Sequence, residues 1–359
     1  MNHINFKTIG LKESHLKEAE GYPDLMIARV SSQYKNSYKV ITENGERLAE
    51  VSGKFHFKVN EWSEYPAVGD FVLINGVDQD ETVIIHHVLS RKSVFGRKAA
   101  GETNDLQIVA TNIDTVFICM ALNNDFNLRR LERYLSIAWD SGANPVIVLT
   151  KADLCQDVPQ MLAEVSSVGL GTAIHVTSSA TDQGLDDLFA YISNGQTVAF
   201  IGSSGVGKST LINHLVGQTI METNGLRDDD KGRHTTTRRE LIVVADKGVL
   251  IDTPGMRELG IVSADFSKSF ADIEELALQC KFNDCSHQTE PKCAVQAAIQ
   301  DGSLSEDRLA SYRKLLKEAK YEGLNPRMIE KVKMNRIFSD FGGMKQGRQH
   351  IKEKNKHKR

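Results

Sequence analysis

The sequence contains no apolar run of about 18 residues, the shortest stretch from which a membrane-crossing helix is built. Residues 1–20 are polar and mixed in charge, without the apolar centre of a secretory signal. Both absences predict a cytoplasmic protein that does not enter a membrane. Excess charge of one sign is also absent, because the formal net charge is −3 over 359 residues. A nucleic acid would therefore be bound by local basic patches and not by the chain as a whole.

Cysteine is scarce, and three of the five cysteines gather with a histidine in one short segment. The spacing C-x4-C-x-H-x5-C is formed by Cys280, Cys285, His287 and Cys293. Three thiolates and one imidazole can close a tetrahedral shell around a structural zinc ion, with no open position for water. We therefore predict one structural Zn²⁺ per chain and a reducing compartment, in place of disulfide bonds. The alternative is that Cys280 only packs inside a helix over residues 270–280 and that the spacing is a coincidence.

An apolar run, Val198–Ile201, leads into a glycine-rich segment that fits the pattern G-x-x-x-x-G-K-[ST]. The segment consists of Gly202, Ser203, Ser204, Gly205, Val206, Gly207, Lys208 and Ser209. A helix is predicted to begin at Thr210, so strand, loop and helix follow in the order of a phosphate loop. We predict that this loop and Thr210 bind nucleotide phosphates, with Lys208 on the β- and γ-phosphates and Ser209 on Mg²⁺. A chance glycine-rich turn is the alternative.

A second polar motif, upstream of the phosphate loop, predicts that the base is guanine. It follows the apolar run 145–149 and consists of Thr150, Lys151, Ala152 and Asp153. This is similar to the guanine motif N-K-x-D, with threonine in place of asparagine. The Asp153 carboxylate would accept from the guanine N1–H and amine, which adenine cannot supply together, and the Lys151 stem would lie along the base. The change at Thr150 leaves the contact to the N7 side of the base open, and an ordinary strand-to-helix turn is the alternative.

Two further segments belong to the predicted nucleotide site. The segment of Ser178, Ser179 and Ala180 follows an apolar run and would place a backbone amide on guanine O6, unless it forms a plain serine-rich turn. Asp252 ends another apolar run and opens a D-x-x-G pattern that closes at Gly255. The Asp252 carboxylate would hold Mg²⁺, and the Gly255 amide would sense the γ-phosphate.

Residues 232–238 form a polar segment without apolar periodicity, which predicts a mobile loop. A threonine of this loop (Thr235, Thr236 or Thr237) would place its hydroxyl on Mg²⁺ when the γ-phosphate is present. Met256 stands where many GTPases carry the glutamine that orients the attacking water. We therefore predict that His234 takes over this task, although it could also serve only to shape the loop. Lys208 and Asp252 would carry the electrostatic part of catalysis, on the phosphates and Mg²⁺.

The order of these motifs differs from that of most GTPases, in which the phosphate loop comes first. Here the base motif (150–153) and the segment 178–180 precede the phosphate loop (202–209), and D-x-x-G (252–255) follows it. This order predicts a circularly permuted GTPase domain. Such a permutation is tolerated because the termini of a domain usually lie close together at its surface.

With this order and these motifs, the chain resembles the bacterial RsgA family of small-ribosomal-subunit-dependent GTPases. The resemblance covers nearly the whole chain and includes the phosphate loop, the K-G-R-H-T-T-T run, D-T-P-G and the cysteine cluster. It implies an N-terminal OB-fold, a central permuted GTPase domain and a C-terminal zinc domain. It also implies late maturation of the small ribosomal subunit, with GTP hydrolysis stimulated by that subunit. The implied partners are the small subunit and its rRNA, GTP and GDP, and we expect a monomer.

The N-terminal region is rich in short strand-like runs, with a strong hairpin signal at Asn44 and Gly45. Such runs suit a small β-barrel, in agreement with the implied OB-fold. Residues 54–58 interleave basic and aromatic side chains, an arrangement that suits stacking of RNA bases. We favour the alternative that these residues form a strand in which Phe55 and Phe57 both face the core.

The predicted protein is therefore multidomain: an N-terminal β-barrel of the OB type, a central permuted α/β GTPase domain with a phosphate loop, and a mostly helical zinc-binding domain. The predicted boundaries are an N-terminal segment 1–22, the OB-fold 23–90, a linker 91–108, the GTPase domain 109–262, the zinc-binding domain 263–340 and a basic tail 341–359.

Two other functions are compatible with parts of this pattern. A phosphate-loop ATPase or kinase would bind ATP about as well as GTP. A nucleotide-gated RNA-binding module would bind GTP without significant turnover. The guanine motif argues against the first, and a measurement of phosphate release separates the second.

Overall fold

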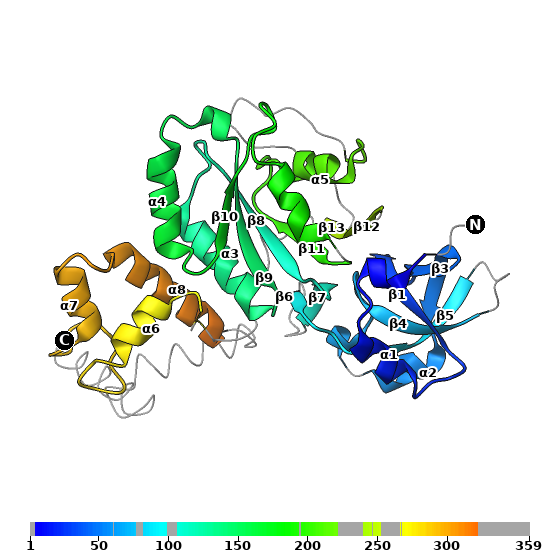
Figure 1. Ribbon diagram of the computed structural model, residues 1–359. Helices are drawn as coiled ribbons and strands as arrows, with labels where there is room; N and C mark the ends of the chain where they lie inside the picture. The colour runs from blue at the N-terminus through cyan, green and yellow to red at the C-terminus, as the bar shows by residue number, and fades with distance from the viewer. Residues whose placement is uncertain are drawn as a thin grey trace, which may run out of the picture.

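The structure is a computed structural model that describes residues 4–59, 61–76, 82–98, 106–193, 195–221, 240–245, 247–252, 266 and 268–321. The described parts form an N-terminal β-barrel, a central α/β domain and a C-terminal helical region, with the α/β domain in the middle (Figure 1). Among the described residues, no helix has the length and apolar character needed to span a bilayer.

Five strands close the N-terminal barrel. They are β1 (Met26–Gln33), β2 (Tyr38–Thr42), β3 (Gly45–Val51), β4 (Phe71–Asn75) and β5 (Thr82–Val88). The strands pair in the order β1-β2-β3-β5-β4, and β4 pairs back onto β1. The predicted hairpin joins β2 to β3, with Thr42 opposite Gly45. This closed five-stranded arrangement confirms the predicted barrel, whose interior is filled by buried side chains such as Val30, Val40 and Val72.

The prediction of a strand over residues 54–58 is wrong. Gly53–Lys58 forms the short helix α2, in which Phe55 is 9% exposed and Phe57 is 92% exposed. The Ser52 side chain accepts a hydrogen bond from the Phe55 amide at 3.0 Å and so caps the helix. Because residues two apart point in different directions on a helix, only one of the two rings reaches the core.

The region predicted as a linker, 91–108, contains a hairpin. Strand β6 (Val94–Lys98) pairs antiparallel with β7 (Leu106–Thr111), and Phe95 is only 1% exposed. Arg91 binds the buried Asp70 of the barrel at 2.7 Å. These contacts attach the described residues of this stretch firmly to the barrel and the α/β domain, unlike an exposed linker.

The N-terminal segment is folded as well and covers the barrel. It contains the 3₁₀ helix η1 (Phe6–Ile9) and helix α1 (Glu13–Ala19). Phe6 and Ile9 are buried in the main core.

The central sheet has the strand order β10-β9-β8-β11-β13-β12. Its strands are β8 (Thr115–Ala121), β9 (Asn144–Thr150), β10 (Ala173–Val176), β11 (Thr197–Ile201), β12 (Glu240–Val244) and β13 (Gly248–Asp252). All neighbours in this order pair in parallel except β12, which is antiparallel to β13. The near-continuous apolar runs of the sequence therefore belong to parallel strands that are buried on both faces.

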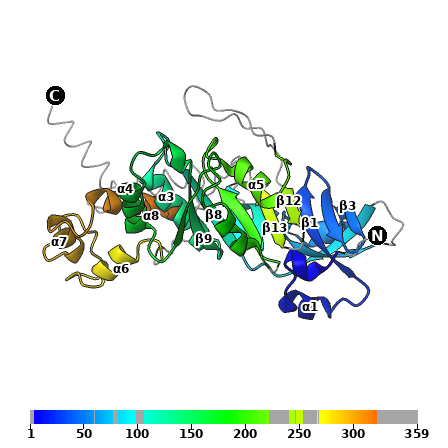
Figure 2. The same ribbon diagram turned by 45° about the horizontal axis from the view of Figure 1, so that its top comes forward.

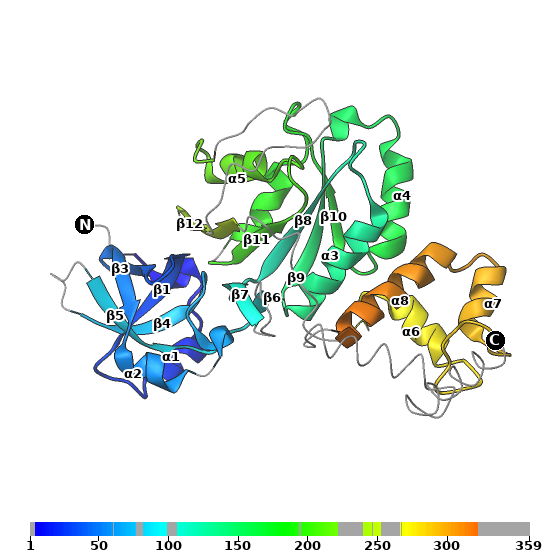
Figure 3. The same cartoon turned by 180° about the vertical axis from the view of Figure 1, so that it is seen from behind.

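Helices cover both faces of the sheet. Helices α3 (Leu128–Asp140) and α4 (Val158–Val168) lie on one face of the sheet (Figure 3). Their side chains share one core with the strand residues that point to their side. Helix α5 (Lys208–Val216) and the 3₁₀ helix η4 (Asp186–Ile192) pack in a second core on the opposite face.

The barrel is joined to the central sheet by strand pairing and by a buried arginine. Ser32 of β1 pairs with Glu240 of β12, so the two sheets run into one another (Figure 2). The fully buried Arg29 donates to the Gly69 carbonyl at 3.2 Å and to Thr197 Oγ1 at 3.0 Å. Burial lowers the pKa of Arg29 to about 10, so the guanidinium stays charged at neutral pH. The barrel is therefore held at the first residue of β11.

The C-terminal region consists of α6 (Ala271–Ala277), α7 (Ala294–Gln300) and α8 (Glu306–Tyr321), with α8 lying against α3 (Figure 3). Arg308 of α8 is buried between two carboxylates. Its guanidinium binds Glu132 of α3 at 3.0 Å and Asp272 of α6 at 2.5 Å. This ion network attaches the helical region to the α/β domain.

Candidate functional site

The carboxyl ends of five parallel strands lie at one edge of the central sheet, and the predicted nucleotide motifs follow those ends. The phosphate loop follows β11, the base motif follows β9, and the 177–180 segment follows β10. Ligands of open α/β sheets bind at this edge. The direct proof of convergence is a hydrogen bond of 2.6 Å from Thr150 Oγ1 to the Val206 carbonyl, which joins segments 56 residues apart.

The predicted strand, loop and helix of the phosphate-loop motif are all present. Helix α5 begins at Lys208, slightly earlier than the sequence predicts. Gly202 has a φ of +153°, and a Cβ there would lie 2.5 Å from the Cys119 carbonyl oxygen. Gly207 has a φ of +104° at the residue before the helix. Side chains are therefore excluded from both ends of the loop, which leaves the backbone amides free to face an anion.

Lys208 reaches back across the phosphate loop. Its Nζ donates to the carbonyl oxygens of Gly202 at 2.9 Å and Ser203 at 2.7 Å. These bonds orient the ammonium at the N-terminus of α5, where helix amides and the dipole also favour negative charge. Ser209 and Thr210 lie in the first turn of the same helix and are partly exposed. Together these residues fit a bound nucleotide phosphate.

Thr150 shows what the change from asparagine does in the base motif. The Thr150 side chain is 4% exposed and turns toward the phosphate loop, where its hydroxyl holds the Val206 carbonyl. The threonine therefore ties the base motif to the phosphate loop, and its hydroxyl is committed to that bond.

Lys151 and Asp153 are positioned differently from Thr150. Lys151 has a φ of +57°, in the left-handed region, and its buried Nζ has no hydrogen-bond partner among the described residues. A buried ammonium without a partner is costly, so the site fits a ligand that supplies an acceptor. Asp153 accepts a hydrogen bond from Ser178 Oγ, which fixes the carboxylate.

The sequence-based prediction placed Ser178 in the guanine-contacting turn with Ser179 and Ala180, but it assigned this residue no contact of its own. Ser178 is fully buried, whereas Ser179 and Ala180 are exposed. Its hydroxyl also accepts from the Ala180 amide at 3.2 Å and so shapes the predicted guanine-contacting turn. A serine-rich turn alone carries no signal that separates these roles, because the partner carboxylate lies 25 residues away.

Asp252 is the last residue of β13 and is 5% exposed. It lies opposite Phe200 in the parallel register, close to the start of the phosphate loop. This is the position from which a carboxylate can approach Mg²⁺ bound beside the phosphates. His234, Thr236, Thr237 and Gly255 lie outside the described residues.

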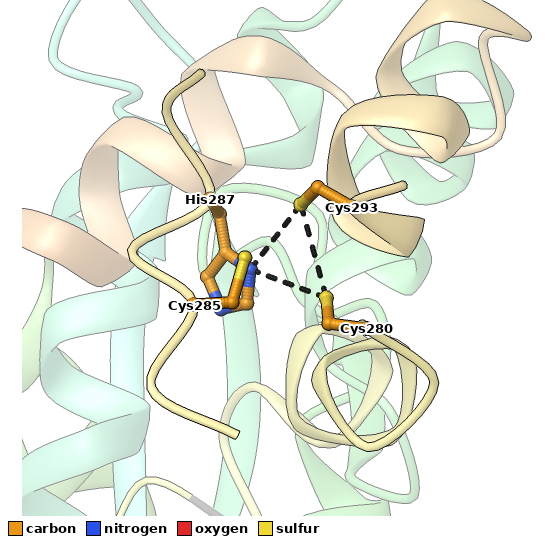
Figure 4. A group of neighbouring side chains, drawn as sticks. All are labelled: Cys280, Cys285, His287 and Cys293. Carbon is orange, nitrogen blue, oxygen red and sulfur yellow. Dashed lines mark hydrogen bonds between the residues drawn. The ribbon is translucent and has the colours of Figure 1, made fainter. Parts of the chain in front are cut away.

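The four predicted zinc ligands form one cluster in the C-terminal region (Figure 4). Their ligand atoms all lie within 4.8 Å of one another. The Cys280 and Cys293 sulfur atoms are 3.8 Å apart, and His287 Nδ1 is 3.6 Å and 3.5 Å from them. Tetrahedral zinc with ordinary bond lengths requires edges of about 3.8 Å between sulfurs and about 3.6 Å between sulfur and nitrogen. The cluster therefore fits a tetrahedral metal ion.

The fold and the converging loops define a phosphate-loop GTPase whose motifs follow a permuted order. A family model described as RsgA GTPase matches residues 88–262. An ABC transporter model matches residues 185–352, a range that also includes the phosphate loop.

Similar proteins cover nearly the whole chain. The small ribosomal subunit biogenesis GTPase RsgA 2 of Lactiplantibacillus plantarum is 52% identical over 90% of this chain and 92% of its own length. RsgA 1 of Oceanobacillus iheyensis is 43% identical over 89% of this chain and 92% of its own length. The crystal structure of YjeQ from Thermotoga maritima matches with a TM-score of 0.61 and 26% identity, over 82% of this chain and 98% of that chain. YloQ, titled a circularly permuted GTPase, matches with a TM-score of 0.58 and 24% identity, over 83% of this chain and 96% of that chain.

The chain belongs to the RsgA family and is a GTP hydrolase. The predicted resemblance and the predicted permuted GTPase fold are confirmed.

Prediction on the base. Asp153→Asn replaces a carboxylate, which can accept from both the guanine N1–H and the guanine amine, by an amide whose NH2 group would face one of these donors, so we expect the preference for GTP over ATP to be lost. Ser178→Ala keeps the carboxylate but frees its orientation, and we expect GTP affinity to fall by roughly fivefold to tenfold. Competition between GTP and ATP for a fluorescent GDP analogue measures both effects. Ser167→Ala, on the exposed side of α4, is the matched control. A retained GTP preference in Asp153→Asn would show that this carboxylate does not select the base.

Proposed function

We propose that this GTPase binds the small ribosomal subunit and acts in its late maturation, hydrolysing GTP to GDP and phosphate with turnover stimulated by that subunit. The observation that carries the proposal is the Thr150–Val206 hydrogen bond, which assembles a single nucleotide site from permuted segments. Support also comes from relatives that are named small ribosomal subunit biogenesis GTPases and that match this chain over most of their length. We also propose that the protein acts as a monomer.

We also propose specific roles for the site residues toward GTP and Mg²⁺. Lys208 would bind the β- and γ-phosphates, and Mg²⁺ would be held by Ser209, Asp252 and Thr236 or Thr237. The ion, when bound, would neutralise charge on the phosphate oxygens. The Gly255 amide would contact the γ-phosphate, and amides of residues 202–207 would surround the other phosphate groups.

His234 is the proposed residue for orienting the attacking water. Met256 has no hydrogen-bonding group that could orient water at the position where many GTPases use glutamine. An imidazole can donate or accept near neutral pH, and the segment 232–238 is the proposed loop over the γ-phosphate.

Prediction on turnover. His234→Ala should keep nucleotide affinity and lower the subunit-stimulated kcat at least tenfold, because general acid–base groups contribute at least that much. The stimulated kcat is measured as the rate of phosphate release with and without small ribosomal subunits. The control is His214→Ala, which removes a histidine that pairs with Asp186 at 3.4 Å. An unchanged subunit-stimulated kcat would show that His234 does not orient the attacking water. Absence of phosphate release by the unmodified protein under both conditions would instead support a nucleotide-gated RNA-binding module.

We propose an RNA contact on the barrel, centred on α2 and the adjoining 3₁₀ helix η2 (Trp62–Glu64). Phe57 is 92% exposed and Trp62 is 66% exposed, and the Trp62 ring packs against Tyr65 at 5.5 Å between centroids. Lys54 and Lys58 are exposed on the same helix as Phe57. Exposed aromatic faces beside lysines suit unstacked RNA bases and their phosphates.

Prediction on RNA binding. The double variant Phe57→Ala/Trp62→Ala should weaken binding to the small subunit at least tenfold, because one base stacked on an aromatic ring contributes about 1–3 kcal/mol. Intrinsic GTP hydrolysis should not change, since the barrel surface contributes nothing to the nucleotide site. Co-sedimentation with small subunits measures binding. Leu170→Ala, which removes a 44% exposed apolar side chain from the α/β domain, is the control. Unchanged binding of the double variant would rule out this surface while leaving the GTPase assignment intact.

We propose that the metal of the four-residue cluster is zinc. Support comes from the three thiolates and one imidazole, which are the usual ligands of structural zinc, and from the ligand spacing. Cys293 also begins α7, where its sulfur accepts from the Gln296 amide at 3.4 Å. The ion would therefore hold together the start of α7 and the segment after α6.

Prediction on the metal. Elemental analysis of the purified protein should find one zinc per chain. Cys285→Ser should lose the zinc and make residues 271–300 sensitive to protease, because the site supplies folding free energy to this region. Cys155→Ser, outside the cluster, should keep both the zinc and the protease resistance. A protein that contains no zinc, or a Cys285→Ser variant that keeps it, would contradict the assignment.

A further inference from the structure

The phosphate loop is also attached to the segment between β8 and α3, and that segment contains none of the nucleotide motifs. Ser203, the second residue of the loop, is 1% exposed, and its hydroxyl donates to Asp125 Oδ2. Asp125 lies between β8 and α3. Because β8 and β11 pair in parallel, the segment after β8 begins directly beside the phosphate loop.

The Asp125 carboxylate is itself held in place. Arg130, in the first turn of α3, binds Asp125 Oδ2 at 3.1 Å and also donates to the Asp125 carbonyl. The Asp125 amide donates to Asn123 Oδ1 at 3.1 Å. Arg130 thereby offsets a negative charge that would otherwise stand close to bound phosphates.

Ser203 is consequently fixed at two points. Its hydroxyl is bound by Asp125, and its carbonyl accepts from Lys208 Nζ at 2.7 Å. Rotation of this peptide would turn the neighbouring amides away from the phosphates, and both bonds oppose that rotation. A loop that is ordered before the nucleotide arrives loses less entropy on binding.

We propose that Asp125 is a positioning residue for GTP hydrolysis: through Ser203 it holds the phosphate loop in the conformation that binds nucleotide. The proposal rests on the assignment of residues 202–209 to the phosphates of GTP. Asp125 does not touch the reacting atoms. Its contribution is equal in the ground state and the transition state, so its loss should raise KM and leave kcat nearly unchanged.

The test measures the Kd for a fluorescent GDP analogue, together with KM and kcat for GTP, in the full-length protein. Asp125→Ala and Ser203→Ala should each raise Kd and KM about tenfold, as expected for loss of a hydrogen bond to a charged group. The double variant should be no worse than either single one, because both remove the same bond. Asp125→Asn should recover most of the lost affinity, since its amide oxygen can still accept from the Ser203 hydroxyl.

Asp187→Ala, which removes an exposed carboxylate from η4, is the control and should bind nucleotide like the unmodified protein. Unchanged Kd in Ser203→Ala, or losses that multiply to about a hundredfold in the double variant, would overturn the role of Asp125. If the Asp125→Ala variant does not fold, Ser203→Ala still tests whether the bond between Ser203 and Asp125 supports nucleotide binding. Failure of the unmodified protein to bind the GDP analogue would instead overturn the nucleotide site itself.

Discussion

The parallel pairing of β11 with β8 on one side and β13 on the other is the constraint on which the rest of the site depends. It brings the ends of three strands together at one edge of the sheet, and β9 and β10 extend that edge. The nucleotide site is defined by which strands are neighbours, and the order in which the chain visits them is free to change. The permutation therefore alters the connection between β10 and β11 without altering the edge itself. The η4 segment of that connection is buried through Leu188 and Ile192 against the sheet.

At this edge, hydrogen bonds from serine and threonine hydroxyls connect the loops, and each bond joins two of them. Thr150 links the β9 loop to the phosphate loop, Ser178 links the β10 segment to the β9 loop, and Ser203 links the phosphate loop to the β8 segment. Each bond crosses between loops of strands that lie close together in the sheet. Four loops, which would otherwise move separately, are thus connected into one structure before any ligand is bound. Loops that are ordered in this way before the nucleotide arrives lose less entropy when it binds.

How much of this arrangement the sequence predicts depends on how far apart in the chain the interacting residues lie. The phosphate loop and the strand before it are specified locally, by glycine spacing and an apolar run, and they were predicted correctly. Residues 54–58 were predicted wrongly because five alternating residues fit a strand as well as a short helix, and the Ser52 cap decides between them. The side-chain contacts of Ser178 and Asp125 were not predicted, because their partners lie 25 and 78 residues away in the sequence. Pairings of that kind depend on strand register, which a single sequence does not reveal.

The two flanking regions are attached to elements that the nucleotide site itself uses. Arg29 binds Thr197, the first residue of β11, and the phosphate loop follows directly after the last residue of that strand. Arg308 binds Glu132 of α3, the helix whose first turn carries Arg130 and so reaches Asp125. Breaking the Arg308 network leaves a buried charge unpaired, at a cost of about 3 kcal/mol or more. The barrel and the C-terminal helical region are therefore oriented by the same strand and helix that position the phosphate loop. Any surface that they present to a large partner is fixed relative to the bound nucleotide.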